Sequence, residues 1–332
     1  MNNIHSEDKD ALLSFGIITD LHYMDVEDGS NYAGTKTRRF RQSLSILKNA
    51  SQYFSSNQTN FNIMLGDILD GKAKSLGIHH DCLDTVLDVC TQQRWYYTLG
   101  NHEYYNFTRE ELEDKLIPRT VSHRPSKSCL YHEFVPMEGF RCLVLDGYDV
   151  STIGASTVQH QQSAEALICQ KNHNYAAGRS NWFDGLAEEN HRYVPFNGGV
   201  SEKQVEWLRS RLEFASSVGD KCIIFSHMPL FVEASKEQNI IWNCERVLSE
   251  LHAAPHGTVL ACISGHDHDG GYAVDSRGIH HIVPPSPIEC DDGEVSFGHL
   301  TVKHDYSLQL SWVGKLPPAK MWPDILPSPV HE

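Results

Sequence analysis

The sequence is short of basic residues and has no long apolar run. Its 332 residues include 28 Lys and Arg against 43 Asp and Glu, for a formal net charge of −15. A surface that binds the phosphate backbone of nucleic acid normally gathers basic side chains, so we expect no nucleic-acid partner. No apolar stretch approaches the roughly 20 residues that cross a bilayer, and the chain start lacks the basic-then-apolar order of a signal peptide. We therefore expect no membrane association and a cytoplasmic location.

Cysteine is sparse and its pattern does not suggest disulfides. The nine cysteines are odd in number and lie mostly inside apolar runs, as Cys142, Cys222 and Cys262 do. This pattern predicts reduced thiols in a core. Hydrophobic residues make up 40% of the chain and charged residues 21%, which is ordinary globular usage and excludes wholesale disorder.

Short apolar segments alternate with helix-like segments along the chain. The predicted strands cover residues 12–18, 61–65, 95–99, 140–145, 222–225 and 259–263. Helical spacing follows at 40–54 and 83–90, and capping signals open further helices at Thr108 and Ser201. Near the C-terminus, 271–275, 279–283, 295–302 and 307–313 alternate with turns and predict a β-meander. The alternation predicts an α/β fold with helices on the sheet faces.

We interpret the chain as one domain, residues 1–332 with a core of about 12–315, because no internal repeat or low-complexity linker divides it. Residues 172–199 are polar, rich in Gly and Asn, and longer than an ordinary connection, which predicts a lid or substrate loop. Residues 316–332 form a Pro-rich tail that we expect to be irregular.

Five predicted strands stop at Gly, Ser or Thr and then place an Asp, Asn or His. The stops are Thr19-Asp20-Leu21-His22, Gly66-Asp67, Gly100-Asn101-His102-Glu103, Ser226-His227 and Gly265-His266-Asp267-His268. In open α/β sheets, the carboxyl ends of strands share one crevice where ligands bind. We therefore expect these side chains to converge.

The converging side chains offer carboxylate, amide and imidazole donors but no thiolate. Such donors suit Mn, Fe or Zn, and Mg tolerates them. They outnumber what one ion needs, so two divalent ions sharing a carboxylate are the simplest interpretation. Each Asp-x-His or His-x-His alone is equally compatible with a solvated turn or a core histidine. Recurrence at five strand ends favours the metal site.

The ordered series resembles the metallophosphoesterase (calcineurin-like phosphoesterase) superfamily over about residues 14–302. Within it, the segments 28–35, 145–149, 196–200 and 265–272 resemble the manganese-dependent ADP-ribose/CDP-alcohol diphosphatases. Members of that subfamily often carry Gln at the position of His22, whereas His fits the wider superfamily. The resemblance implies a four-layer α/β/β/α sandwich with a dinuclear metal site at the carboxyl ends of the strands.

The resemblance also implies a role for each donor. One metal would be surrounded by Asp20, His22, Asp67 and His268, and the other by Asp67, Asn101, His227 and His266, with Asp67 as the bridge. Two ions, Mn²⁺ by resemblance, would hold a hydroxide between them and neutralise the phosphoryl oxygens. His102 would act in catalysis by steadying the transition state or protonating the departing oxygen. The alternative is that it orients Asp67 or Asn101.

Flat apolar side chains hold nucleobases. The first candidates are Tyr32 and Phe196, and the second are Tyr104, Tyr105 and Tyr272. The backbone of Asn197, Gly198 and Gly199 offers N–H groups to a phosphate or ribose. The cluster Arg38, Arg39 and Arg41 either reaches a distal phosphate or forms a solvated helix face.

The implied activity is that of an ADP-ribose/CDP-alcohol diphosphatase, a hydrolase acting on phosphorus-containing anhydrides. It would cleave the pyrophosphate bond of ADP-ribose, CDP-choline, CDP-glycerol and related compounds by attack of the metal-bridging hydroxide. The alternatives are a phosphomonoesterase or a (cyclic) nucleotide phosphodiesterase of the same superfamily, and a non-catalytic binding scaffold. We expect a small nucleotide substrate and a monomer. The acidic surplus does not oppose such a substrate, since bound cations supply positive charge where it docks.

Overall fold

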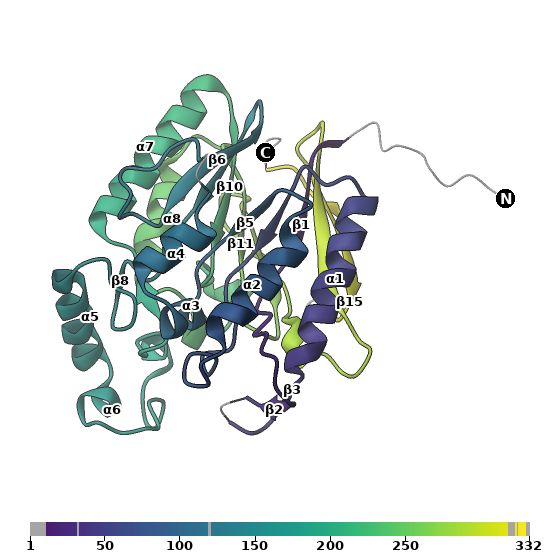
Figure 1. Ribbon diagram of the computed structural model, residues 1–332. Coiled ribbons are helices and arrows are strands. Elements are labelled where there is room, and N and C mark those ends of the chain that lie inside the picture. The colour runs from purple at the N-terminus through teal and green to yellow at the C-terminus, as the bar shows by residue number, and fades with distance from the viewer. Residues whose placement is uncertain (1–10, 32, 119–120, 318–322, 324, 330–332) are drawn as a thin grey trace.

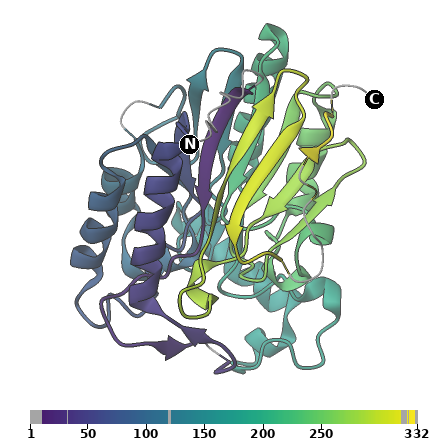
Figure 2. The ribbon, with the colours of Figure 1, turned by 90° about the vertical axis from the view of Figure 1, so that its right-hand side faces the viewer.

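Two six-stranded sheets pack face to face, with helices on both outer surfaces (Figures 1 and 2). The computed structural model describes residues 11–31, 33–118, 121–317, 323 and 325–329. Helices α1 (Phe40–Ser56) and α2 (His79–Cys90) cover the first sheet. Helices α7 (Glu202–Val218) and α8 (Cys244–Ala253) cover the second. The predicted four-layer α/β/β/α sandwich is confirmed.

The first sheet has the strand order β16-β15-β14-β1-β4-β5. Its strands are β1 (Ala11–Ile18), β4 (Phe61–Met64), β5 (Trp95–Tyr97), β14 (Ser296–Lys303), β15 (Leu308–Gly314) and β16 (Ile325–Leu326). Strands β1, β4 and β5 run parallel, whereas β14 is antiparallel to β1. The carboxyl ends of β1, β4 and β5 therefore meet at one edge. Strand β16 also shows that the tail, expected to be irregular, adds a short strand.

The second sheet has the strand order β12-β13-β11-β10-β7-β6. Its strands are β6 (His132–Met137), β7 (Phe140–Val144), β10 (Lys221–Ser226), β11 (Val259–Ser264), β12 (Gly271–Val274) and β13 (His280–Val283). Strands β7, β10, β11 and β13 are parallel neighbours. The prediction of one C-terminal β-meander is wrong, because β12 and β13 join this sheet while β14 and β15 cross to the first. Turn spacing predicts hairpins but carries no information about the sheet that each hairpin joins.

Aliphatic and aromatic side chains fill the space between the sheets. Phe15 of β1 and Phe61 of β4 stack with ring centroids 4.8 Å apart, and Phe225 of β10 meets Phe15 edge-on at 5.7 Å. All three are at most 1% exposed. Burying each such ring contributes roughly 2–3 kcal/mol, so this layer holds the two sheets, and the strand ends they carry, in a fixed relation.

Shorter elements surround the strand ends. They are β2 (Gly29–Ser30), β3 (Thr37–Arg38), α3 (Asn101–Asn106), α4 (Arg109–Leu116), η2 (Val232–Ala234), η3 (Glu237–Asn239) and η4 (Pro287–Glu289). The capping box predicted at Thr108 is present, since its hydroxyl accepts from the backbone of Glu111.

Residues 150–199 form an excursion from the second sheet (Figure 1). It contains β8 (Val150–Ser151), α5 (Val158–Lys171), α6 (His173–Ala176), η1 (Glu188–Asn190) and β9 (Gly198–Gly199). The segment predicted as a loop at 172–199 thus includes a helical turn and a short strand. Helix α5 escaped prediction because only Ala164 and Ile168 are buried, which leaves little apolar periodicity in its sequence.

The cysteine prediction is confirmed, because all nine cysteines lie in the described part of the chain and none forms a disulfide. Eight are buried and Cys169 is exposed. Among the described residues, no helix combines the length and apolar character needed to cross a membrane.

Candidate metal centre

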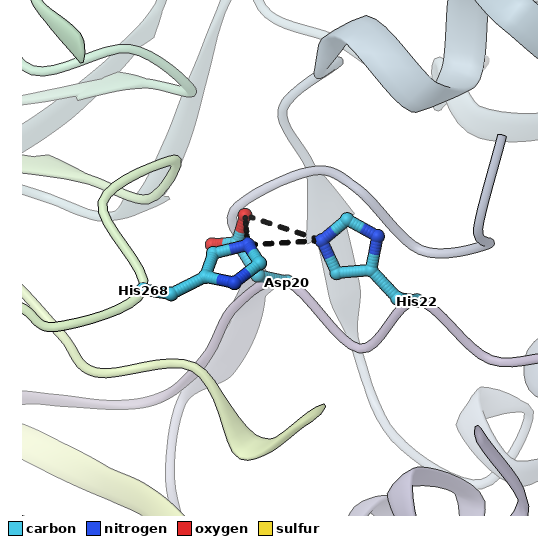
Figure 3. A group of neighbouring side chains, drawn as sticks. All are labelled: Asp20, His22 and His268. Carbon is cyan, nitrogen blue, oxygen red and sulfur yellow. Dashed lines mark hydrogen bonds and ion pairs between the residues drawn. The ribbon is translucent and has the colours of Figure 1, made fainter. Parts of the chain in front are cut away.

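Side chains from both sheets gather at the strand carboxyl ends in three overlapping groups. The groups are Asp20, His22 and His268; His22, Asp67 and His102; and Asp67, His227 and His266. Within each group, the potential ligand atoms lie within 4.8 Å of one another. Figure 3 shows the first group, in which one ring nitrogen of His22 points toward a ring nitrogen of His268, beside the Asp20 carboxylate. The sequence prediction that the five strand stops converge is confirmed.

Asp67 lies between the groups. Its Oδ2 is 3.6 Å from Nε2 of His22 and 3.5 Å from Nε2 of His227. Its Oδ1 accepts a hydrogen bond from the backbone N–H of His102. Burial alone would raise the pKa of Asp67, but the charges of His227 and His102 hold it well below its ordinary value. One carboxylate oxygen is therefore shared by imidazoles of both sheets.

Four of these side chains stand on left-handed backbone. The φ angles are +46° for Asp20, +46° for His22, +50° for Asp67 and +68° for His266. Non-glycine residues rarely adopt this region, and such conformations persist where surrounding structure enforces them. The backbone N–H of His22 donates to the carbonyl of Asp67, which holds two of these bends together. The centre is thus built from sharp turns at the strand ends.

The glycines at the strand stops leave room for the donors. A Cβ on Gly100 would overlap Oδ1 of Asp67 and lie 2.7 Å from Nε2 of His227. A Cβ on Gly66 would lie 2.5 Å from Nδ1 of His227, and Gly66 also has φ +86°. Both strand stops therefore require glycine for space, and at Gly66 for conformation as well.

Glu103 organises the loops between these donors. Its carboxylate accepts from the backbone N–H groups of Asp67 (2.7 Å), Ile68 (2.8 Å) and Gly100 (2.7 Å). Burial, with the nearby Asp67, raises the pKa of Glu103 to about 8. Its direction could not be read from the sequence, because the loops that it joins follow two different strands. In the structure the Glu103 side chain is buried and holds the backbone of Asp67 by a hydrogen bond.

Backbone and side-chain partners orient the histidines. Nδ1 of His227 lies 2.7 Å from the carbonyl oxygen of Leu65, which only accepts. Nδ1 of His268 lies 2.9 Å from Oε1 of Glu289. Each Nδ1 therefore carries the proton, and each Nε2 presents its lone pair to the centre when the ring is neutral.

The donor set fits divalent cations. Nε2 of His22 lies 3.0 Å from Nε2 of His268, and Nε2 of His227 lies 3.1 Å from Nδ1 of His266, beside carboxylates in both cases. Burial lowers the pKa of His266 to about 3, which keeps that ring neutral. Burial alone would lower the pKa of His227, but the neighbouring Asp67 carboxylate raises it to about 9. The surroundings of the His227 ring therefore stabilise a positive charge. Neutral imidazoles beside buried carboxylates are ordinary ligands of Mn²⁺, Fe or Zn²⁺.

His102 stands at the edge of the centre with a defined tautomer. The backbone N–H of Gly71 donates to its Nδ1 over 2.6 Å. Its Nε2 therefore bears the proton and lies 3.9 Å from Oδ2 of Asp67. Burial lowers the pKa of His102. The neutral ring can donate a hydrogen bond from Nε2 into the cavities that it lines.

Two adjoining cavities lie at the centre. One, of about 380 Å³, is lined by donors of both sheets, including His22, Asp67 and His266. The other, of about 660 Å³, is lined by Tyr105, Trp182 and Phe196. The two cavities share Asn31, Arg38, Asn101, His102 and Phe196. A polar donor site therefore adjoins a larger space with aromatic walls.

The aromatic candidates separate clearly in the structure. Phe196 and Tyr105 line the larger cavity, whereas the buried Tyr104 hydroxyl bonds to Asp146. Tyr272 lines neither cavity, since its ring stacks on His280. Tyr32 lies outside the described residues. Trp182, which the sequence analysis missed, faces Phe196 with centroids 6.0 Å apart; no periodic or strand-end signal marks it.

Asn197 and Gly198 do not reach the cavities. Both are buried and line neither one, and the Asn197 side chain instead contacts His266.

The three clustered arginines have different surroundings. Arg38 lines both cavities and pairs with Asp70. Arg39 donates to a backbone carbonyl, and Arg41 pairs with exposed carboxylates.

Comparison with known proteins agrees with this geometry. The calcineurin-like phosphoesterase profile matches residues 13–270. The chain is 33% identical to the manganese-dependent ADP-ribose/CDP-alcohol diphosphatase of Bos taurus, covering 95% of each chain, and 36% identical to that of Oryza sativa subsp. japonica, covering 91% and 92%. A dimetal phosphatase structure from Danio rerio superposes with a TM-score of 0.85 at 33% identity, over 92% of this chain and 98% of that one. The chain belongs to the calcineurin-like phosphoesterase family.

Proposed function

We propose that this protein hydrolyses the pyrophosphate bond of ADP-ribose, CDP-alcohols such as CDP-choline and CDP-glycerol, and related nucleoside diphosphate compounds. The observation that carries this proposal is the pair of adjoining cavities, one lined by the proposed metal donors and one by aromatic rings. A substrate with two phosphates and a base would occupy both cavities, whereas a small monoester would occupy only the first. The relatives from Bos taurus and Oryza sativa are ADP-ribose/CDP-alcohol diphosphatases, which supports ADP-ribose and CDP-alcohols as substrates.

Two sets of ligands share Asp67 in this proposal. One set is Asp20, His22, Asp67 and His268, and the other is Asp67, Asn101, His227 and His266. The position of Asp67 Oδ2 between His22 and His227 supports a bridging role. Two Mn²⁺ ions bound there would supply an activated water and neutralise charge on the phosphoryl oxygens.

His102 is the proposed catalytic residue beside the metal ligands. The bond from Gly71 places its proton on Nε2, at the wall shared by both cavities. From there it donates to the oxygen that leaves phosphorus, or to a phosphoryl oxygen as charge develops. Holding Asp67 is a weaker role, since the 3.9 Å separation is longer than a hydrogen bond.

The base would lie against Trp182, Phe196 and Tyr105. Their rings give the larger cavity flat apolar surfaces on which any base can stack. Arg38 supports phosphate binding from the boundary of the two cavities, because it is the cationic side chain common to both linings. Stacking tolerates different bases, which fits a substrate range that spans adenine and cytosine.

The proposed setting is a monomer in the cytoplasm. Donors and aromatic walls all come from one chain, so the site needs no second copy. The nine unpaired cysteines suit a reducing compartment. Light scattering of the purified protein tests whether it is a monomer. The acidic net charge of −15 supports the absence of nucleic-acid and anionic-membrane partners.

A substrate profile tests the proposal. Metal-free protein is reloaded with Mn²⁺ and assayed against ADP-ribose, CDP-choline, CDP-glycerol, a phosphomonoester series and cyclic nucleotides at one metal concentration. We expect the diphosphates to give the highest kcat/KM, with a nucleoside monophosphate as product. Intact diphosphates alongside rapid cleavage of a monoester or cyclic nucleotide would overturn the assignment.

A further inference from the structure

Asn197 connects the excursion at 150–199 to the metal centre. Asn197 is fully buried, and its Oδ1 lies 2.8 Å from Nε2 of His266. Its Nδ2 lies 2.9 Å from the carbonyl oxygen of Arg192 and 2.8 Å from that of Gln238. One amide thus joins three separate segments of the chain.

These partners define the orientation of the amide. Both carbonyls only accept hydrogen bonds, so the atom facing them must be the NH₂ group, which donates to both. The atom facing His266 is then the amide oxygen, which only accepts. Nε2 of His266 must therefore be the protonated nitrogen, and Nδ1 presents its lone pair towards His227 and Asp67.

The backbone on both sides of Asn197 is held as well. The Asn197 N–H donates to the carbonyl of Val194, and the Gly198 carbonyl accepts from Trp242. Gly198 and Gly199 pair with β8. The amide is held from both sides, so it constrains the His266 ring more than a mobile side chain could.

We propose that Asn197 is a positioning residue that fixes the tautomer and ring direction of His266 for metal binding. It touches neither cavity, so it does not contact the substrate. The inference rests on His266 being a metal ligand in the proposed function, and it requires no particular substrate. Outer partners of metal-bound histidines typically change metal affinity by about 10- to 100-fold when removed.

The test measures Mn²⁺ binding to metal-free protein by electron paramagnetic resonance, without substrate. In Asn197→Ala we expect about 10- to 100-fold weaker binding at one of two sites, and the spectrum of a spin-coupled Mn²⁺ pair should give way to that of isolated ions. Asn197→Asp keeps an oxygen acceptor for His266 but places another oxygen against two carbonyls. It should therefore lower the melting temperature while retaining more Mn²⁺ affinity than the alanine variant.

Asn172→Ala is the matched control. Asn172 is also buried in the excursion, but its amide bonds only within it, to Asn174, Tyr175 and Tyr193. Circular dichroism verifies the fold of each variant, and if Asn197→Ala fails to fold, Asn197→Asp and Asn172→Ala are compared instead. The inference would be overturned if Asn197→Ala still bound Mn²⁺ tightly at two sites. It would also be overturned if Asn172→Ala weakened Mn²⁺ binding at one site as much as either Asn197 variant does. Fewer than two sites in the wild type would instead refute the ligand assignment.

Discussion

The backbone N–H of Gly71 donates a hydrogen bond to Nδ1 of His102 over 2.6 Å, which places the imidazole proton on Nε2 at the wall of the cleft. Loss of this proton donor should affect turnover and leave metal binding intact. We expect His102→Ala to lower kcat by about 10²–10⁴-fold, the usual contribution of a positioned acid or base. Mn²⁺ content, measured by elemental analysis, should match the wild type.

His80→Ala is the control for that variant, because His80 lies on the exposed side of α2, away from both cavities. Its activity should be unchanged. Full activity in His102→Ala would show that the imidazole takes no part in catalysis. Loss of bound Mn²⁺ would show that His102 contributes to metal binding.

Gly100→Ala should damage the metal centre through steric overlap. The added Cβ would overlap Oδ1 of Asp67, and neither that carboxylate nor the neighbouring His227 can move freely because both are buried. We expect weaker Mn²⁺ binding in a calorimetric titration and a loss of roughly 1–3 kcal/mol in unfolding free energy. In Gly77→Ala, where the Cβ meets nothing within 4 Å but φ is +72°, only stability should fall. Wild-type Mn²⁺ affinity in Gly100→Ala would contradict the crowding described here.

Trp182→Ala should weaken substrate binding more than chemistry. Trp182 lines the larger cavity beside Phe196, and base stacking on an aromatic ring is worth about 1–3 kcal/mol. We expect KM for ADP-ribose to rise about tenfold or more in steady-state assays, with a smaller change in kcat. Phe214→Ala, which removes an aromatic side chain 42% exposed on α7, should leave both constants unchanged. A loss confined to kcat in Trp182→Ala would argue against a stacking role.

Glu250 should make stability depend on acid pH. Hydrogen bonds from Arg209 on α7, together with Arg246 on α8, lower the pKa of Glu250 from 4.5 to about 2. Because the folded value lies below the unfolded one, the stabilisation is present above about pH 4.5 and lost as pH falls towards 2. In urea unfolding, Glu250→Gln should be less stable by about 1 kcal/mol at neutral pH, and the two proteins should converge near pH 2. A constant difference across that range would show that packing, not charge, is responsible.

The convergence of the proposed metal donors could be predicted from the sequence, because they follow five strands whose carboxyl ends meet. Asp20, Asp67 and His227 stand immediately after apolar runs, and parallel strands bring their ends together whatever the details of packing. Glycine at the stops added a second local signal. The alternation of strands and helices predicts an α/β fold, whereas the four-layer arrangement is implied by the family resemblance.

The partners of those donors could not be predicted. Asn197 and Trp182 lie in a polar segment that contacts residues 236–243 and the proposed metal ligand His266. Their roles are set by tertiary contacts, which leave no periodic trace in the sequence. Tyr272 is a candidate substrate contact because it follows His268 closely in the sequence, but strand β12 places its ring against His280 and outside both cavities.

The donors are divided between the halves of the chain. Asp20, His22, Asp67 and Asn101 follow strands of the first sheet, whereas His227, His266 and His268 follow strands of the second. Neither half holds a complete set of the proposed ligands, so cations bound by both sets would cross-link two layers that otherwise meet through apolar side chains. During synthesis, the proposed centre could not form until residue 268 had left the ribosome. Metal binding by these ligands would therefore follow the docking of the two sheets.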